Sequence, residues 1–400
     1  MLIGLLGKAN VGKSTFFNAA TDLGVAVANY PFTTIQANVG IAYLRVQCVC
    51  KEFNVKDNPI HSFCIDGNRF IPVNLIDVAG LVPGAHQGKG LGNKFLDDAR
   101  QADALIHVID ASASTDIEGH PIDAGSGDVM QDIKFVEQEF DLWISSLIKR
   151  DWEKAARDSG GNEQKLEQMI VKRLSGLSIA EVEIKNSLNK LGLGKKHPSL
   201  WSDTDFYELS KTIRLKSKPI IVAANKADIS TAEKYILLTK EIGLEVIPCS
   251  SEIEILLKKA SKKDIVDYLP GDSSFIVKNA NTLTEPQKKA LHVAQVFLDR
   301  YKSTGIQDIL KHVCLTVLKY IVVYPVEDDV KLMDKKGNVL PESKLIPKGY
   351  TTKDLAFSIH SDIGKGFLYA IDVRTRQRLG SDYALKNNDV VKIVSTMTRG

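Results

Sequence analysis

The chain has 400 residues, more than one compact core usually holds, so we expect two or three domains. A composition of 44% hydrophobic and 25% charged residues is typical of a globular protein and excludes a disordered chain. The formal net charge of +3 is too small by itself to indicate nucleic-acid or membrane binding, so any charge argument must be local.

No apolar run approaches the roughly 20 residues that are needed to cross a bilayer. The apolar residues 2–6 have no basic leader before them, so they indicate a buried first strand rather than a signal peptide. Five cysteines form no even, tightly spaced disulfide framework, which favours a reducing compartment. We therefore expect a cytoplasmic protein without a membrane partner.

Short apolar segments alternate with loops and helical stretches in the first part of the chain. Strands are expected at residues 3–6, 73–76, 105–109, 219–224 and 245–248. Strands that alternate with helices predict a mainly parallel sheet with helices on both faces, an α/β fold. We assign this domain to residues 1–110 and 216–318 and interpret residues 111–215 as an insertion.

The insertion has a helical pattern. Its apolar residues at 129, 133, 136, 140, 143 and 147 follow spacings of four and three, and a second helical pattern begins after the turn at 158–162. One interpretation is an antiparallel helical hairpin that projects from the first domain. Helices that lie across the sheet fit the pattern equally well.

Cys48 and Cys50 form a C-x-C pair, which differs from the usual C-x-x-C zinc knuckle, and no second pair follows. We interpret them as two side chains on one face of a strand rather than as metal ligands.

Residues 7–14 fit the pattern G-x-x-x-x-G-K-[ST] and lie directly between an expected strand and an expected helix. Glycines let successive backbone N–H groups point at phosphates, next to the positive end of the following helix. Lys13 is expected to reach the β- and γ-phosphates, and the Ser14 hydroxyl to bind Mg²⁺. The predicted nucleotide-binding residues here are Lys8, Ala9, Asn10, Val11, Gly12, Lys13, Ser14 and Thr15.

A second motif, D-x-x-G, closes a strand at Asp77 and Gly80. Asp77 is expected to hold Mg²⁺ through water, and the Gly80 N–H to sense the γ-phosphate. A threonine between the two motifs is expected to complete the Mg²⁺ site and to be released when the γ-phosphate leaves. We prefer Thr34 for this role, with Thr33 as the alternative.

The third motif, N-K-x-D, comprises Asn225, Lys226 and Asp228 after an expected strand. The Asp228 carboxylate can accept hydrogen bonds from both N1–H and the exocyclic amine of guanine, whereas adenine has no donor at N1. Asn225 is expected to tie this segment to the phosphate loop, and the Lys226 stem to lie over the base. Ser250 and Ser251, after the next strand, suit the last guanine-contacting loop.

From residue 320 the sequence changes to short β segments with polar turns, and we assign residues 320–397 to a separate α+β module. Within it, Arg374, Arg376 and Arg378 alternate. On a strand they would share one face, which suits RNA phosphates, although a solvated edge strand is an equally good interpretation.

These motifs, with residues 29–34 and the glycine-rich run 84–93, resemble the Obg family of translation-associated P-loop GTPases. The resemblance is to the YchF-related branch, and most to its archaeal GTP-binding proteins. It implies that the C-terminal module is a TGS domain of β-grasp fold. It also implies a molecular switch that binds GTP and GDP and associates with the ribosome or ribosomal RNA. ATP-preferring members of this branch have an altered base motif, whereas this chain keeps Asp228.

In the position where Ras-type GTPases orient the attacking water with glutamine, this chain has Leu81. The resemblance implies a GTPase with a hydrophobic substitution, in which Lys13, His86 or Asn10 supports catalysis. His86 could position water or could be a solvent-facing loop residue. Asn10 could help hold K⁺ or could cap its loop. An RNA-binding scaffold with negligible hydrolysis and an ATP-using relative are the alternative functions.

Overall fold

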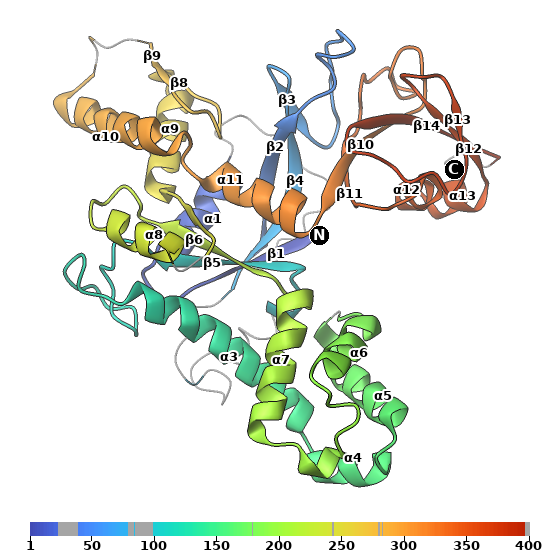
Figure 1. Cartoon of the computed structure of the whole chain (residues 1–400). Coiled ribbons are helices and arrows are strands. Elements are labelled where there is room, and N and C mark those ends of the chain that lie inside the picture. Colours follow the sequence, from blue (N-terminus) through green and yellow to red (C-terminus); the bar gives the residue numbers. More distant parts are fainter. Residues whose placement is uncertain are drawn as a thin grey trace. The chain divides into compact units, whose positions relative to one another are not determined.

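The computed structural model (Figure 1) describes residues 1–22, 39–78, 84, 99–177, 179–241, 244–278, 281 and 283–396. These residues form two compact units. Among them, the first unit takes residues 1–22, 39–41 and those from 74 to 309, and the second takes residues 42–73 and 310–396. Among the helices in these ranges, none is long and apolar enough to cross a membrane.

A mainly parallel sheet contributes its strands β1, β5, β6 and β7 to the centre of the first unit, whereas β3 and most of β2 and β4 belong to the second unit. Its strand order is β2-β4-β1-β5-β6-β7, and β3 pairs with β4 outside this path. Every residue of β5 is buried, as expected for a central parallel strand that is covered on both faces. All five strands expected from the sequence are present. The bounds are β1 Leu2–Leu6, β2 Val39–Gln47, β3 Phe63–Ile65, β4 Asn68–Asp77, β5 Ala104–Asp110, β6 Ile220–Asn225 and β7 Val246–Pro248.

Helices and one short hairpin accompany this sheet in the first unit. Leu257 of α9 and Leu298 of α10 are fully buried in one apolar cluster with Val222 of β6. The bounds are α1 Lys13–Thr21, α8 Ala232–Glu241, α9 Ser251–Lys262, β8 Val266–Asp267, β9 Ile276–Val277, α10 Glu285–Tyr301 and α11 Ile306–Lys311.

Among its described residues, the insertion contains five α-helices, more than the two of a single hairpin. Asp128 caps the first of them by accepting a hydrogen bond from the Gln131 backbone N–H. Figure 1 shows α3 and α7 side by side, with the shorter helices beyond them. Phe140 and Ile170, from the two expected apolar stripes, are fully buried in one core. The helices are α3 Val129–Lys149, α4 Trp152–Ser159, α5 Glu163–Leu174, α6 Glu181–Lys190 and α7 Asp203–Ser217.

The second unit contains a five-stranded mixed sheet with the order β11-β10-β14-β12-β13. Strand β10 uses both faces, as the period of two predicts. Ile321 and Val323 pack against Leu355 of α12, whereas Val322 and Tyr324 pack in a second core that includes residues 48–50 and 71. The unit is thus larger than the segment 320–397. Its elements are β10 Tyr320–Val326, β11 Lys344–Pro347, α12 Thr352–Ile359, α13 Ser361–Lys365, β12 Phe367–Asp372, β13 Arg378–Leu379 and β14 Asp389–Ser395.

One buried ion pair joins α3 to α7 within the insertion. Arg214 Nε lies 2.6 Å from Asp141 Oδ1, and both residues are 1% exposed. A second guanidinium nitrogen, Nη2, donates to Asp141 Oδ2 at 3.2 Å and to Glu137 Oε2 at 3.1 Å. Burial raises the pKa of the Asp141 carboxyl, and the hydrogen bonds from Arg214 oppose this rise. The buried Asp141 carboxylate therefore depends on Arg214 to remain charged.

We predict that Arg214→Met lowers the free energy of unfolding by about 3–5 kcal/mol, because it leaves the Asp141 charge buried and unpaired. Urea unfolding at neutral pH measures this loss. The deficit should shrink as pH falls through the raised pKa of Asp141 and the carboxyl becomes neutral. Asp141→Leu combined with Arg214→Met should recover most of the stability, and equal losses in the single and double variants would contradict the prediction.

Candidate nucleotide-binding site

The loop between β1 and α1 contains a backbone angle at Gly12 that glycine adopts far more easily than other residues. Gly12 has a φ of 88°, and a Cβ there would lie 2.3 Å from Asn225 Nδ2. The Gly12 carbonyl accepts the Phe16 N–H at 2.8 Å, which begins the helix. The first turn of α1 contains no acidic residue, so the positive end of the helix dipole is not neutralised by its own side chains. The loop therefore offers an environment suited to an anion.

Three polar side chains converge where α1 begins. Lys13 Nζ lies 3.0 Å from Asp77 Oδ1, and Ser14 Oγ donates to Asp77 Oδ2 at 3.1 Å. Asp77 Oδ1 is buried and has no aligned hydrogen bond among the described residues. A hydroxyl and a carboxylate at the end of a strand are the hard oxygen ligands that Mg²⁺ prefers, so these residues fit that ion.

Asn225 connects the phosphate loop to the segment after β7. Its Nδ2 donates to the Val11 carbonyl at 3.0 Å. Its Oδ1 accepts from the backbone N–H and the hydroxyl of Ser251, at 3.1 and 3.0 Å. Because Asn225 is only 3% exposed, these bonds pair the amide oxygen twice and one amide N–H out of contact with water. The tie expected from the sequence is present, and Ser251 is part of it.

Asp110, at the end of β5, holds the loop that follows this strand, which no sequence motif had indicated. Its carboxylate accepts hydrogen bonds from Ser112, Ser114 and Thr115 and from Lys226 Nζ, the last at 2.9 Å. Burial alone would raise the pKa of Asp110, but the bonds from Ser112, Lys226 and Ser114 outweigh it and hold the pKa below its usual value. The sequence feature that could have indicated this loop is an aspartate at a strand end followed by Ser and Thr.

The Lys8 ammonium lies inside the protein rather than free for a ligand. It is 2.6 Å from Asp132 Oδ2 of α3 and donates to the carbonyls of Thr115 and Asp116 at 3.2 and 2.6 Å. The side chain of Lys8 thus anchors the loop after β5. Its backbone remains part of the phosphate loop.

Asn10, with a φ of 61°, donates from Nδ2 to the Gly119 carbonyl at 2.9 Å. A Cβ at Gly119 would come within 2.6 Å of the Ala9 carbonyl oxygen, so the two loops touch closely there. Asn10 therefore fastens the phosphate loop to the loop after β5, and this contact uses the amide nitrogen, not the amide oxygen.

The remaining base-motif residues have distinct environments. Lys226, with a φ of 60°, directs its ammonium to Asp110 and Ser114. Asp228 is exposed in the turn that follows β6. Ser250 is buried and caps α9 by accepting the Ile253 N–H at 3.3 Å. The Ser250 hydroxyl therefore has a structural role in the helix cap.

Several sequence predictions lie outside the described residues. These are Thr33, Thr34, Gly80, Leu81 and His86.

The condition for a shared face, that the three arginines lie on one strand, is not met. Strand β12 ends at Asp372, so Arg374 and Arg376 lie in the turn before β13, and only Arg378 is on a strand. Arg374 forms a two-point ion pair with Glu52 at 2.6 and 2.8 Å, and Arg376 Nη1 pairs with Asp329 at 2.7 Å. Two of the three guanidiniums thus already have carboxylate partners. Alternation in the sequence did not reveal the turn.

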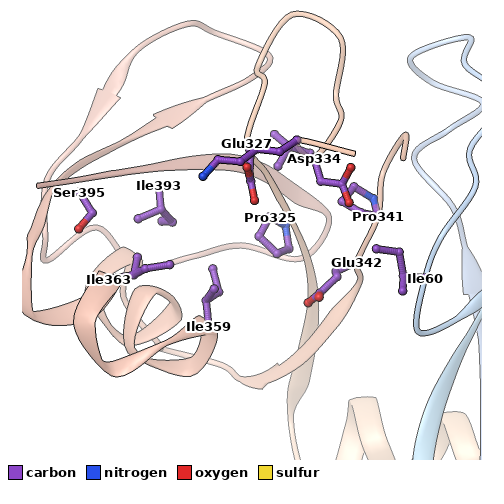
Figure 2. Close-up of a pocket in the computed structure, with 12 residues that line it drawn as sticks. Ile60, Pro325, Glu327, Asp334, Pro341, Glu342, Ile359, Ile363, Ile393 and Ser395 are labelled. Atoms are coloured by element: carbon purple, nitrogen blue, oxygen red, sulfur yellow. The ribbon is translucent and has the colours of Figure 1, made fainter. Parts of the chain in front are cut away.

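The second unit also contains a pocket, shown in Figure 2. Ile359 and Ile363 contribute apolar surface, and the carboxylates of Glu327, Asp334 and Glu342 lie among its lining residues. This acidic lining is unsuited to phosphate, which distinguishes the pocket from the loop at the start of α1.

Three family models match the chain in sequence. Residues 2–137 match the 50S ribosome-binding GTPase model, and residues 223–328 match the model described as Obg-like GTPase YGR210-like, G4 motif-containing domain. Residues 333–395 match the TGS domain. The match to the TGS domain confirms the fold expected for the C-terminal module.

Full-length similarity extends across both units. The chain is 48% identical over 396 residues to an uncharacterized GTP-binding protein of Methanocaldococcus jannaschii, covering 98% of this chain and 99% of the relative. A crystal structure of a GTP binding protein from Pyrococcus horikoshii is 39% identical, with a TM-score of 0.76 and coverage of 99% and 100%. The Schizosaccharomyces pombe YchF GTPase, at 19% identity, shares the fold with a TM-score of 0.58 over 98% of this chain and 97% of that one.

The converging phosphate-loop side chains, the buried asparagine tie and this similarity lead to one assignment. The chain belongs to the YchF-related branch of the Obg-like GTP-binding proteins, the P-loop GTPases that carry a TGS domain.

Proposed function

We propose that this protein binds GTP with Mg²⁺, hydrolyses it to GDP and phosphate, and acts as a molecular switch. The main support is the convergence of Lys13, Ser14 and Asp77 at the N-terminus of α1. A triphosphate there would meet the Lys13 ammonium and the backbone N–H groups of residues 8–15. Mg²⁺, when bound, would neutralise phosphate charge, with Ser14, Asp77 and Thr34 as its proposed protein partners.

Guanine selection is assigned to the base motif. Asp228 is exposed at the end of β6, so its carboxylate is available to a ligand, and Asn225 holds this segment to the phosphate loop. A carboxylate matches the two donors of guanine and leaves adenine unmatched. We assign base contacts to Lys226, Asp228 and the segment at Ser250 and Ser251 where α9 begins, and γ-phosphate sensing to Gly80. An ATP-using function is disfavoured for the same reason.

The residue after the D-x-x-G motif is Leu81, so no glutamine is available there to orient the attacking water. Lys13 would stabilise charge that develops on the transferred phosphoryl group. The Asn10 amide nitrogen is used by Gly119, so its oxygen is the atom suited to a K⁺ ion. His86 is the alternative group for positioning water. If neither acts, the protein would be a nucleotide-regulated scaffold with negligible hydrolysis.

A ribosomal or ribosomal-RNA partner is part of the proposal, and the description of the matching family as ribosome-binding GTPases supports it. Because Arg374 and Arg376 pair with carboxylates in a turn, the argument that they share a strand face toward RNA no longer applies. The partner proposal therefore rests on the family and not on these arginines. A cytoplasmic location is also part of the proposal.

We predict that Asp228→Asn weakens GTP binding by about 10- to 100-fold, because one hydrogen bond to a charged group is lost and an amide faces the guanine donors. Xanthosine triphosphate should gain affinity, since its C2 carbonyl accepts from the new amide. Competition titrations against a fluorescent GDP analogue measure both changes. Asp382→Asn, an exposed carboxylate of the second unit, is the matched control. Unchanged guanine preference in Asp228→Asn would refute the assignment.

Asn225→Ala should lower the free energy of unfolding by about 1–3 kcal/mol and weaken GDP binding, because buried groups of Val11 and Ser251 lose their partner. Denaturant unfolding and nucleotide titration provide the two measurements. Asn18→Ala, on the exposed side of α1, should change neither by a comparable amount. If Asn225→Ala is destabilised yet binds GDP normally, the tie serves folding only.

Single-turnover phosphate release should be faster in K⁺ than in Na⁺ and faster again with ribosomes, because the cation and the partner would supply what Leu81 lacks. Asn10→Ala should lose the K⁺ effect while retaining release in Na⁺. An equal fall in both salts would instead indicate that Asn10 acts by fastening its loop to Gly119. Absence of release under every condition would support the scaffold function.

A further inference from the structure

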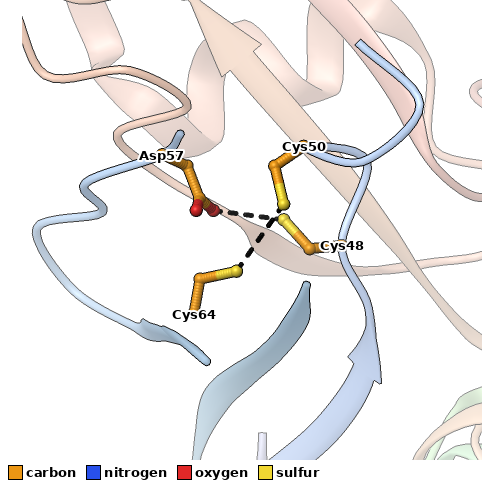
Figure 3. A group of neighbouring side chains, drawn as sticks. All are labelled: Cys48, Cys50, Asp57 and Cys64. Atoms are coloured by element: carbon orange, nitrogen blue, oxygen red, sulfur yellow. Dashed lines mark hydrogen bonds between the residues drawn. The ribbon is translucent and has the colours of Figure 1, made fainter. Parts of the chain in front are cut away.

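Three thiols and one carboxylate converge in the second unit, away from any motif used above. The ligand atoms of Cys48, Cys50, Asp57 and Cys64 all lie within 4.8 Å of one another. Figure 3 shows the four side chains pointing toward a common centre. Cys48 Sγ lies 3.2 Å from Asp57 Oδ2, and Cys50 Sγ lies 3.8 Å from Cys64 Sγ. The cysteines are free thiols, so no disulfide explains the grouping.

Local structure explains how residues so far apart in sequence meet. Cys48 follows directly after β2, and its N–H donates to the Gly67 carbonyl at 2.9 Å. Cys64 is on β3, whose two-residue turn to β4 is Asp66-Gly67 with φ values of 50° and 77°. Asp-Gly is a preferred pair for such a turn. The hairpin thus returns Cys64 to the end of β2.

The spacing of the sulfur atoms matches a known coordination geometry. For zinc–sulfur bonds of about 2.3 Å, the edge of a tetrahedron between two sulfurs is roughly 3.8 Å. The Cys50–Cys64 separation equals this edge, at 3.8 Å. A disulfide would need about 2.05 Å between the same atoms. This pair of thiols is therefore spaced as two zinc ligands would be, and the other ligand atoms lie within 4.8 Å.

A buried arginine also contacts two of the proposed ligands. Arg69, with a fully buried side chain, donates from Nη2 to Asp57 at 2.8 Å and to Cys48 Sγ at 3.4 Å. Such outer hydrogen bonds orient metal ligands. Three thiolates and a carboxylate carry four negative charges, which a divalent ion and this guanidinium largely balance.

A plain apolar core is the competing interpretation, because Cys48 and Cys50 pack with Val322 and Tyr324. That interpretation accounts for all three thiols as small hydrophobic groups, since Cys64 also packs against this core. An apolar core does not by itself require a carboxylate among the thiols. Asp57, 7% exposed, lies 3.2 Å from Cys48 Sγ while it also pairs with Arg69.

An entry route is present as well. A pocket open to solvent is lined by Cys50, Asp57 and Cys64 among its residues. An ion could therefore reach the cluster without unfolding of the unit.

We propose that Cys48, Cys50, Cys64 and Asp57 bind one Zn²⁺ ion in a closed, structural S₃O site. Soft thiolates select Zn²⁺ over Mg²⁺ and Ca²⁺, and four protein ligands leave no open position for catalysis. The ion would fasten the loop after β2 to the β3–β4 hairpin. Because Cys48 and Cys50 pack against β10, it would also stabilise that core of the second unit.

The full-length protein, purified under reducing conditions with zinc in the medium, should contain about one zinc per chain by mass spectrometric metal analysis. Removal of zinc with a chelator should lower Tm, and reloading with Co²⁺ should produce thiolate charge-transfer and tetrahedral d–d absorption bands. Cys50→Ser and Cys64→Ser should lose the metal and these bands. Asp57→Asn should bind it more weakly.

Cys314→Ser is the matched control, since Cys314 is also fully buried but outside the cluster, and it should retain full metal content. Two outcomes would overturn the proposal. One is a folded, reduced wild-type protein that holds no stoichiometric zinc and gives no charge-transfer band with Co²⁺. The other is a metal-free protein in which mild oxidation joins Cys50 to Cys64, which would identify a redox pair. GTP binding is measured separately, so loss of zinc and failure of the proposed GTPase function are distinguishable.

Discussion

The first unit depends on one buried amide. Asn225 ends a central strand, donates to Val11 in the phosphate loop and accepts from Ser251 at the start of α9. Three loops from distant parts of the chain are thereby held in one arrangement before any ligand is present. Gly12 has no side chain because the Asn225 amide occupies that space. Preorganisation of this kind lowers the entropic cost of ligand binding.

The sequence predicted the structure best where a local pattern itself restricts the backbone angles or the burial of side chains. The phosphate loop requires glycine at position 12 for its backbone angles, and the parallel strands appear as short apolar runs because both sheet faces are covered. The asparagine tie could be expected because N-K-x-D follows a strand. Fold and family were therefore accessible from the sequence.

Long-range partners were not accessible in the same way. Nothing near Lys8 in the sequence indicates that its ammonium meets Asp132. The buried carboxylate of Asp110 is recognised only when the donors of four residues surround it. The arginine alternation predicted a strand where a turn forms. Likewise, Cys48 and Cys50 appeared to be an isolated pair until the Asp66-Gly67 turn brought Cys64 beside them. Such contacts are determined by tertiary pairing, which a single sequence does not display.

The ion pair between Lys8 and Asp132 has a mechanical consequence. Asp132 lies in the first turn of α3, a helix of 21 residues, which spans about 30 Å at 1.5 Å per residue. A rod held near one end converts a slight rotation at that end into a larger displacement at its tip. The pair therefore connects the phosphate loop directly to a helix whose far end, at Ile144 and Ile148, packs in the core of the helical insertion.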